Sequence, residues 1–93
     1  MIAKANYFRS LDKWEDLKRR ARLKGKDWDP RYWRFLAEKP CGFCIEHKGK
    51  CVGCEMEGHC STTLQEGIAA AKRKDRDACE ACAYRMVAAV ERV

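Results

Sequence analysis

The feature that most constrains this chain is a run of five cysteines within twenty residues, CGFCIEHKGKCVGCEMEGHC at positions 41–60. These cysteines are Cys41, Cys44, Cys51, Cys54 and Cys60. The first four form two CxxC pairs, and a two-residue gap lets both sulfurs of a pair reach one ion. Thiolate is a soft ligand, and a tetrahedral zinc site needs four such groups roughly 3.8 Å apart. The run therefore predicts a cysteine-bound metal, with zinc as the expected ion.

The spacing leaves the choice of the four ligands open. The six residues between the two pairs, IEHKGK, are fewer than the about 15–20 typical of paired CxxC zinc sites. Cys60 is an alternative to Cys51 or Cys54 as the fourth ligand, and His59 is a weaker substitute. The competing interpretation is a loop of free thiols, which would be prone to oxidation.

A tight turn is predicted between the two pairs. Glycine accepts positive φ at little cost, so Lys48-Gly49 favours a turn. A short β-hairpin about this turn would bring the two CxxC pairs side by side. Lys48, Lys50 and His47 would then offset the negative charge of four thiolates.

A third CxxC pair, Cys79 and Cys82, lies on the apolar face of a predicted helix. Because free cysteine behaves as a small buried hydrophobe, we expect these two residues in the core. The alternative is that they complete an iron–sulfur cluster or a second metal site.

The N-terminus, MIAKANYFRSLDKWEDLKRR, lacks the apolar segment of a secretory signal, and no stretch approaches the length of a membrane span. We therefore expect a cytoplasmic chain with no membrane partner. Thiols stay reduced in that compartment, and the odd total of seven cysteines also argues against a disulfide framework. Export by another route would favour disulfides instead.

Helical patterns flank the cysteines. Ser10 is predicted to cap a first helix over 10–24, with Gly25 as its stop. Asp29 as N-cap with Pro30 at the first position predicts a second, short helix that Pro40 ends.

Two further helices are predicted after the cysteines. Thr63-Leu-Gln-Glu66 has the pattern of a capping box, and Asp77-Ala-Cys-Glu80 opens the last helix. The apolar stripe of that helix consists of Cys79, Cys82, Met86, Val90 and Val93. The expected fold is therefore mainly α, a single small domain over 1–93 of three to four helices around a metal-stapled cysteine-rich loop. Its parts are a basic, aromatic helical segment (1–40), the metal-binding loop (41–60) and a helical segment (61–93).

The net charge of +6 is concentrated at one end of the chain. Residues 1–40 hold 12 Lys or Arg against 6 Asp or Glu, and seven of the nine aromatic residues. Cations and aromatic rings are what phosphate contacts and base stacking require. The residues predicted to bind nucleic acid or an acidic protein are Lys13, Lys18, Arg20, Arg22, Lys24 and Trp28. The competing interpretation is a solvated basic face, with Trp14 and Trp33 in the core.

The order of motifs over roughly residues 33–93 resembles small cysteine-rich proteins encoded by bacteriophages and prophages. These carry CxLC, CxGCP and one further cysteine, which CGFC, CVGC and Cys60 match in this chain. The chain differs in Glu55, where proline is usual, and in its additional Cys79 and Cys82. The resemblance implies a protein of a bacterial or phage-infected cell with a cysteine-bound metal, and it implies no substrate.

These observations favour a non-enzymatic module with a structural zinc, acting as an accessory or regulatory protein that binds a macromolecule. The basic segment makes nucleic acid the first expected partner. The alternatives are a phage regulator that binds a host protein, and an iron–sulfur protein. An enzyme is least expected, because no paired carboxylates, nucleophile–base pair or phosphate-binding loop occurs outside the cysteines, and four cysteine ligands leave zinc no open position.

Overall fold

The computed structural model describes residues 3–48, 54 and 56–93. The helices in that part of the chain are α1 (Lys4–Arg20), the 3-10 helix η1 (Gly25–Asp27), α2 (Pro30–Glu38), α3 (Gly42–Glu46), α4 (Glu57–Ser61), α5 (Thr63–Lys72) and α6 (Arg76–Glu91). The described residues include no strand. The predicted mainly helical fold class is therefore confirmed.

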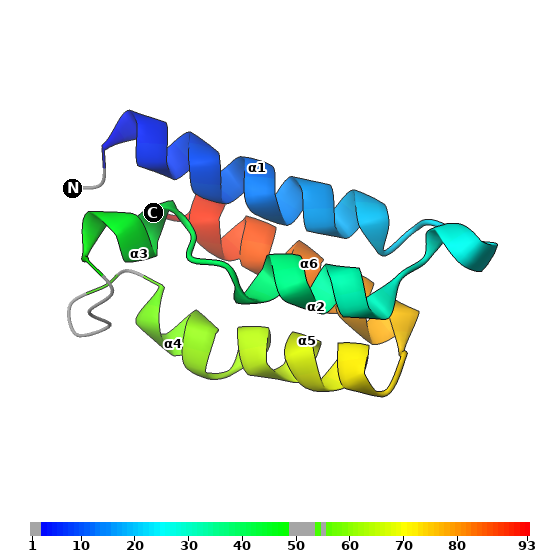
Figure 1. Cartoon of the computed structure of the whole chain (residues 1–93). Helices are drawn as coiled ribbons and strands as arrows, with labels where there is room; N and C mark the ends of the chain where they lie inside the picture. The colour runs from blue at the N-terminus through cyan, green and yellow to red at the C-terminus, as the bar shows by residue number, and fades with distance from the viewer. Residues whose placement is uncertain (1–2, 49–53, 55) are drawn as a thin grey trace.

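The four longer helices form an up-and-down bundle. Following the chain, α1, α2, α5 and α6 run alternately in opposite directions along the long axis (Figure 1). α1 packs on α6, α6 on α5, α5 on α2, and α2 returns to α1. Antiparallel neighbours joined by short connections are typical of such bundles. The short helices α3 and α4 close the end of the bundle where α1 begins and α6 ends (Figure 1).

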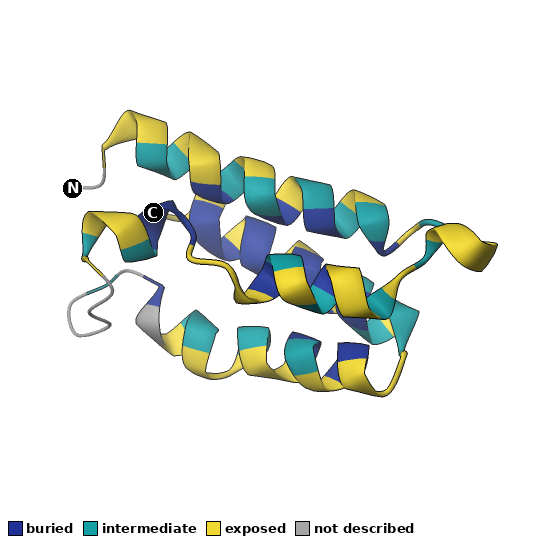
Figure 2. Cartoon of the chain, in the orientation of Figure 1, coloured by how far each residue is buried: buried dark blue, intermediate teal, exposed yellow. Residues whose placement is uncertain are grey.

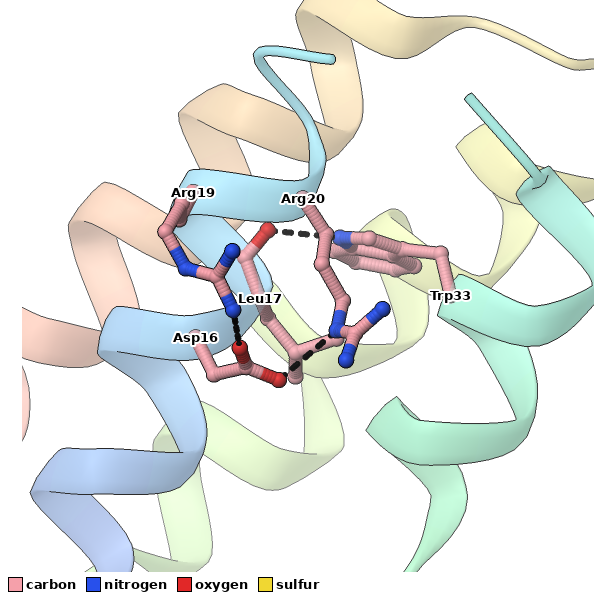
Figure 3. Close-up of polar contacts among 5 residues, drawn as sticks. All are labelled: Asp16, Leu17, Arg19, Arg20 and Trp33. Carbon is pink, nitrogen blue, oxygen red and sulfur yellow. Dashed lines mark hydrogen bonds and ion pairs between the residues drawn. The ribbon is translucent and has the colours of Figure 1, made fainter. Parts of the chain in front are cut away.

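Two tryptophans form the centre of the core. Trp14 of α1 and Trp33 of α2 are each 1% exposed, and Figure 2 shows the buried faces of the helices turned toward one another. The indole nitrogen of Trp33 donates a hydrogen bond to the carbonyl oxygen of Leu17 at 3.0 Å (Figure 3). A buried indole N–H usually finds such a partner, because leaving it unpaired is costly. The core interpretation of these two tryptophans is therefore correct.

α5 and α6 approach closely through small side chains. A Cβ atom on Gly67 of α5 would lie 2.3 Å from the sulfur of Cys82 on α6. Ala70, Ala71 and Ala83 are buried in the same core. Glycine weakens an isolated helix by about 1 kcal/mol relative to alanine, but here only glycine leaves room for the sulfur.

The predicted limits of α2 agree with the structure. Asp29 is the N-cap, and its Oδ1 accepts hydrogen bonds from the backbone N–H groups of Arg31 and Tyr32 at 3.0 and 3.1 Å. Pro30 takes the first helical position, and the helix ends at Glu38, before Pro40. The ends of this short helix are therefore set by residues at or next to them, namely Asp29, Pro30 and Pro40.

The predicted start of the first helix is wrong. α1 begins at Lys4, so Ser10 lies inside the helix instead of capping it. Ser10 is fully buried, and its hydroxyl donates to the carbonyl oxygen of Asn6 at 3.0 Å. The helix ends at Arg20, before the predicted stop. Gly25 instead opens η1 with a φ of 61°, in the left-handed region that favours glycine.

The helices after the cysteines form, but they begin differently from the prediction. The capping box at Thr63 is not made, because α4 directly precedes α5 and Thr62 donates its hydroxyl to the carbonyl oxygen of Gly58 at 2.7 Å. α6 is capped two residues earlier than predicted, by Asp75, whose carboxylate accepts from the N–H of Ala78.

The apolar stripe of α6 is buried from Cys79 to Val90, whereas Val93 lies past the helix end and is 47% exposed.

The predicted hairpin does not extend over the first CxxC pair. Cys41 is the residue before α3 and Cys44 lies within that helix, so this arm is helical. Lys48 has a φ of 54°, which agrees with a turn after α3. The rest of the predicted hairpin, residues 49–53, lies outside the described residues.

Candidate metal centre

Four of the five cysteines predicted as metal ligands line one cavity at the closed end of the bundle. These are Cys41, Cys44, Cys54 and Cys60, and the cavity has a volume of about 520 Å³. Its remaining lining comes mainly from apolar and cationic side chains, including Trp14, Ile45, Leu64, Met86, Lys13 and Lys48. The fifth predicted ligand, Cys51, lies outside the described residues. The fold thus gathers thiols from several segments around one space.

Helix α3 sets the position of the first pair. Cys41 is its N-cap and Cys44 lies three residues on, so both side chains fall on the same side of the helix. Cys41 is buried and Cys44 is half-buried. Both are free thiols in the structure.

The other two cysteines come from the segment that enters α4. Met56 is fully buried and holds this segment in the core. The backbone N–H of Cys60 donates to the carbonyl oxygen of Met56 at 2.9 Å, which begins α4. Cys54 and Cys60 therefore lie on either side of a buried anchor, and both face the cavity.

Burial and mutual proximity keep Cys44 and Cys60 protonated without a metal. Burial raises the pKa of Cys60 to about 11, and the neighbouring Cys41, Cys44 and Cys54 act in the same direction. Burial also raises the pKa of Cys44, with Cys41 as the next cause. Because thiolate is the form that binds metal, loading this cavity must release protons.

Lys13 places a positive charge at the same cavity. Its Nζ donates to the carbonyl oxygens of Ala37 and Lys39 at 3.0 and 2.5 Å, at the end of α2. The ammonium lies 4.8 Å from the ring centre of Trp14. Burial lowers the pKa of Lys13, and Cys41 opposes this most strongly among the neighbouring cysteines. Lys13, predicted to bind a macromolecule, is thus a neighbour of the thiols.

Trp14 adds an unpaired donor to the cavity wall. Its indole nitrogen is buried and, within the part of the chain that the structure describes, has no hydrogen-bond partner. An unsatisfied buried donor costs about 1–3 kcal/mol, so native proteins seldom leave one. Trp14 also lines the thiol cavity, where a sulfur anion would be a suitable acceptor.

The four thiols share a cavity, but their placement does not yet form a complete set of metal ligands. Among the described residues, no three histidine, cysteine or acidic side chains lie close enough to hold a metal ion as they are placed. The donor chemistry therefore fits zinc, whereas fewer than three of the described ligands are placed to share one ion.

Cys79 and Cys82 belong to the core and not to this cavity. Cys79 Sγ lies 3.8 Å from the carbonyl oxygen of Gly67, and Cys82 Sγ lies 3.3 Å from that of Thr63. Both cysteines are buried between α5 and α6, and burial raises their pKa values to about 12 and about 11 respectively.

Most cations predicted to bind a partner are engaged within the protein. Lys18 pairs with Glu15 at 2.9 Å, Arg20 with Asp16 at 2.8 Å and Arg22 with Glu80 at 2.6 Å; Figure 3 shows Arg19 and Arg20 sharing Asp16. Lys24 is exposed but lies beyond the end of α1, and Trp28 is partly buried against the core. Lys18, Arg20 and Arg22 therefore already have carboxylate partners in the protein, and the role of the six residues in binding a macromolecule stays a prediction.

Sequence reasoning missed the place of Lys13 and Trp14 in the cavity. The signal in the sequence was that Lys13 borders the apolar face of its helix, next to a tryptophan on that face. It also missed the exposed aromatic pair on α2, Tyr32 and Phe35, which are 45% and 56% exposed.

No family model matches the chain, and neither curated proteins nor solved structures include a match. None of the described helices is long and apolar enough to cross a membrane.

Proposed function

We propose that this chain is a small non-enzymatic module whose fold is held together by a cysteine-bound zinc ion. The observation that carries the proposal is that Cys41, Cys44, Cys54 and Cys60 line one cavity although they come from separate segments. These four would hold the ion, with Cys51 as the alternative to one of them. Four thiolates close the coordination shell, which makes the role of the metal structural.

The wall of the cavity suits an anionic centre. Zinc with four thiolates carries a net charge of −2, and outer donors stabilise such centres by hydrogen bonds and opposite charge. Lys13 supplies the positive charge, and Trp14 has a buried indole N–H without a partner in the described part of the chain. Both groups come from α1, so a loaded centre would join that helix to α3 and α4.

Metal binding would supply stability that the core alone lacks. A domain of 93 residues buries only roughly two-thirds of its unfolded surface, so its margin is small. A cavity of about 520 Å³ at one end leaves that end poorly packed. Bringing the four thiols onto one ion would close it and tie the short helices to the bundle.

The cavity volume favours one second candidate, an iron–sulfur cluster. A cluster also takes four cysteine thiolates but is larger than a single ion. The space among these thiols, about 520 Å³, is ample for it. Such a protein would be coloured, whereas the zinc protein would be colourless.

The test combines metal analysis, an absorption spectrum and thermal melting. We expect one zinc per chain, no visible absorption, and a lower melting temperature after a strong chelator. Cys41→Ser and Cys44→Ser should lower the melting temperature in the same way and should respond less to the chelator. Cys79→Ser is the matched control, because it removes a thiol outside the cavity and should keep the full chelator response. Unchanged melting after verified metal removal would contradict the proposal.

A further inference from the structure

An exposed pair of aromatic rings lies on the outer face of α2. Tyr32 and Phe35 are three residues apart, so they share one side of the helix. Their ring centres are 6.3 Å apart with planes inclined by only 17°, and about half of each side chain is exposed. The core of the protein uses the opposite side of α2, where Trp33 and Ala37 are buried. These rings are therefore not needed to fill the interior.

Cations accompany both rings. The guanidinium carbon of Arg20 lies 5.0 Å from the ring centre of Tyr32, and the ammonium of Lys39 lies 4.7 Å from that of Phe35. Arg31 is exposed and precedes Phe35 by four residues, which places it on the same side of α2. We call these five residues, Arg20, Arg31, Tyr32, Phe35 and Lys39, the α2 aromatic patch.

The patch carries a positive charge that is not fully neutralised. Arg20 shares Asp16 with Arg19, so one carboxylate serves two cations there (Figure 3). In the described part of the chain, Arg31 and Lys39 have no carboxylate partner. An anionic ligand would therefore be favoured over a neutral or cationic one.

We infer that the α2 aromatic patch binds single-stranded nucleic acid, with bases stacking on Tyr32 and Phe35 and phosphates near Arg20, Arg31 and Lys39. Flat exposed rings with cations beside them meet the two needs of such binding, base stacking and phosphate contact. A duplex offers the phosphates but keeps its base faces stacked internally. A purely acidic polypeptide such as polyglutamate would pair with the cations and leave the rings uncovered.

This inference goes beyond the proposed zinc centre and does not depend on it. Of the five patch residues only Lys39 also lines the thiol cavity, and neither aromatic ring does. The patch shares only Arg20 with the residues that the sequence predicted for nucleic-acid binding. The exposed rings and the pairing of each ring with a cation are properties of the folded surface.

The experiment is a fluorescence titration with the full chain as purified. The probes are a labelled oligo(dT) of about 12 nucleotides, which is within the range of known site sizes, and a duplex of equal length. We expect the parent to bind the single strand more tightly than the duplex. Affinity should fall as salt rises, because neutralising phosphates releases condensed counterions.

The decisive variant is Tyr32→Leu with Phe35→Leu, which keeps apolar volume and helix propensity but removes the ring faces. Its affinity for oligo(dT) should fall at least about tenfold, since the variant loses two rings and stacking on each contributes about fivefold or more. Phe8→Leu is the matched control: Phe8 is 46% exposed on α1, lies edge-on to Tyr7, and is not part of the patch. This control should bind as the parent does.

Lys39→Gln separates the charge contribution from stacking. This variant should weaken the binding of the single strand and of the duplex by a similar factor, and it should reduce the salt dependence of binding. Circular dichroism of every variant confirms folding, and Tyr32→Leu alone replaces the double variant if the latter unfolds. Equal binding by the parent and the ring variants would overturn the inference. So would no binding at low salt, or equal affinity of the parent for oligo(dT), duplex and polyglutamate.

Discussion

Gly42 of α3 lies directly against Asn6 of α1, so that a Cβ atom on Gly42 would be only 1.9 Å from the carbonyl oxygen of Asn6. The side-chain amide of Asn6 also donates to the carboxylate of Glu46 at 2.7 Å, at the other end of α3. The absence of a side chain and this hydrogen bond together hold α3 on α1. Because Cys41 and Cys44 flank Gly42, the same contact sets the position of the first thiol pair.

Gly42→Ala should therefore destabilise the protein and disturb the thiol cavity. A methyl group has no room against backbone atoms, and overpacking of this kind costs at least about 1–3 kcal/mol. Urea unfolding gives the stability change, and competition with a chelator gives the change in zinc affinity. Gly58→Ala is the matched control: a Cβ there meets nothing within 4 Å, and alanine should stabilise α4 by up to about 1 kcal/mol. Equal stabilities of the two variants would show that α3 does not depend on this contact.

Lys13→Met should lower both stability and metal affinity. It removes the hydrogen bonds to the carbonyl oxygens of Ala37 and Lys39 and the positive charge beside the thiols. Hydrogen bonds from a charged group contribute about 1.5–3 kcal/mol, which is the loss we expect in the free energy of unfolding.

Lys18→Met provides the comparison for Lys13→Met, because Lys18 is on the same helix but pairs with Glu15 at the surface. Exposed pairs contribute only about 0–1 kcal/mol. Zinc affinity should be unchanged in this control and reduced in Lys13→Met. If both variants bind zinc as tightly as the parent does, Lys13 does not contribute to metal binding.

Alkylation should divide the cysteines into two groups. In the zinc-free folded protein at mildly alkaline pH, we expect iodoacetamide to modify Cys44 and Cys60, which are partly exposed. Cys79 and Cys82 are only 0% and 3% exposed, so they should stay unmodified until the protein unfolds, because burial leaves the reagent no access to their sulfurs. Burial raises the pKa of Cys60 to about 11, which slows its reaction but leaves its sulfur accessible. Peptide mass spectrometry of samples taken over time gives the order in which the cysteines are alkylated. Early modification of Cys79 would mean that α5 and α6 separate readily.

Asp16 should make stability depend on acid pH. Burial acts to raise the pKa of Asp16, but hydrogen bonds from Arg20 and Arg19 outweigh it, so its pKa is below the ordinary value of 3.8. A carboxyl whose pKa is lower in the folded state than in the unfolded state stabilises the protein fully at pH values above 3.8. That contribution is lost as the pH falls through the folded-state pKa. Asp16→Asn should therefore lower the free energy of unfolding by about 0.3–1 kcal/mol at pH 7. At a pH well below the folded-state pKa of Asp16, it should change that free energy by almost nothing.

The measurement is urea unfolding of the parent and of Asp16→Asn at a series of pH values, from pH 7 to well below 3.8. Asp12→Asn, on the exposed face of the same helix and outside this ion pair, is the control. A constant difference between the parent and Asp16→Asn at every pH would refute the ion-pair explanation.

The residues of α2 determined its limits by themselves. The Asp29 side chain satisfies the first N–H groups, Pro30 favours helical φ, and Pro40 stops continuation, all within a few residues. The helical fold class and the metal-binding cysteines were also predicted from local patterns, since helical periodicity and CxxC spacing are local signals. Of these, the helical class is confirmed, and the metal remains a prediction.

Only the tertiary structure decided where α1 begins and what Lys13 does. Ser10 is of a residue type that is favoured as an N-cap. However, Gly42 packs against α1 beside Ser10, and the helix begins six residues earlier, at Lys4. Lys13 has the pattern of a surface cation, but the end of α2 presents two carbonyl oxygens to it at the thiol cavity. Local propensity differs by only about 1 kcal/mol among most residues, so contacts between segments far apart in sequence decide such cases.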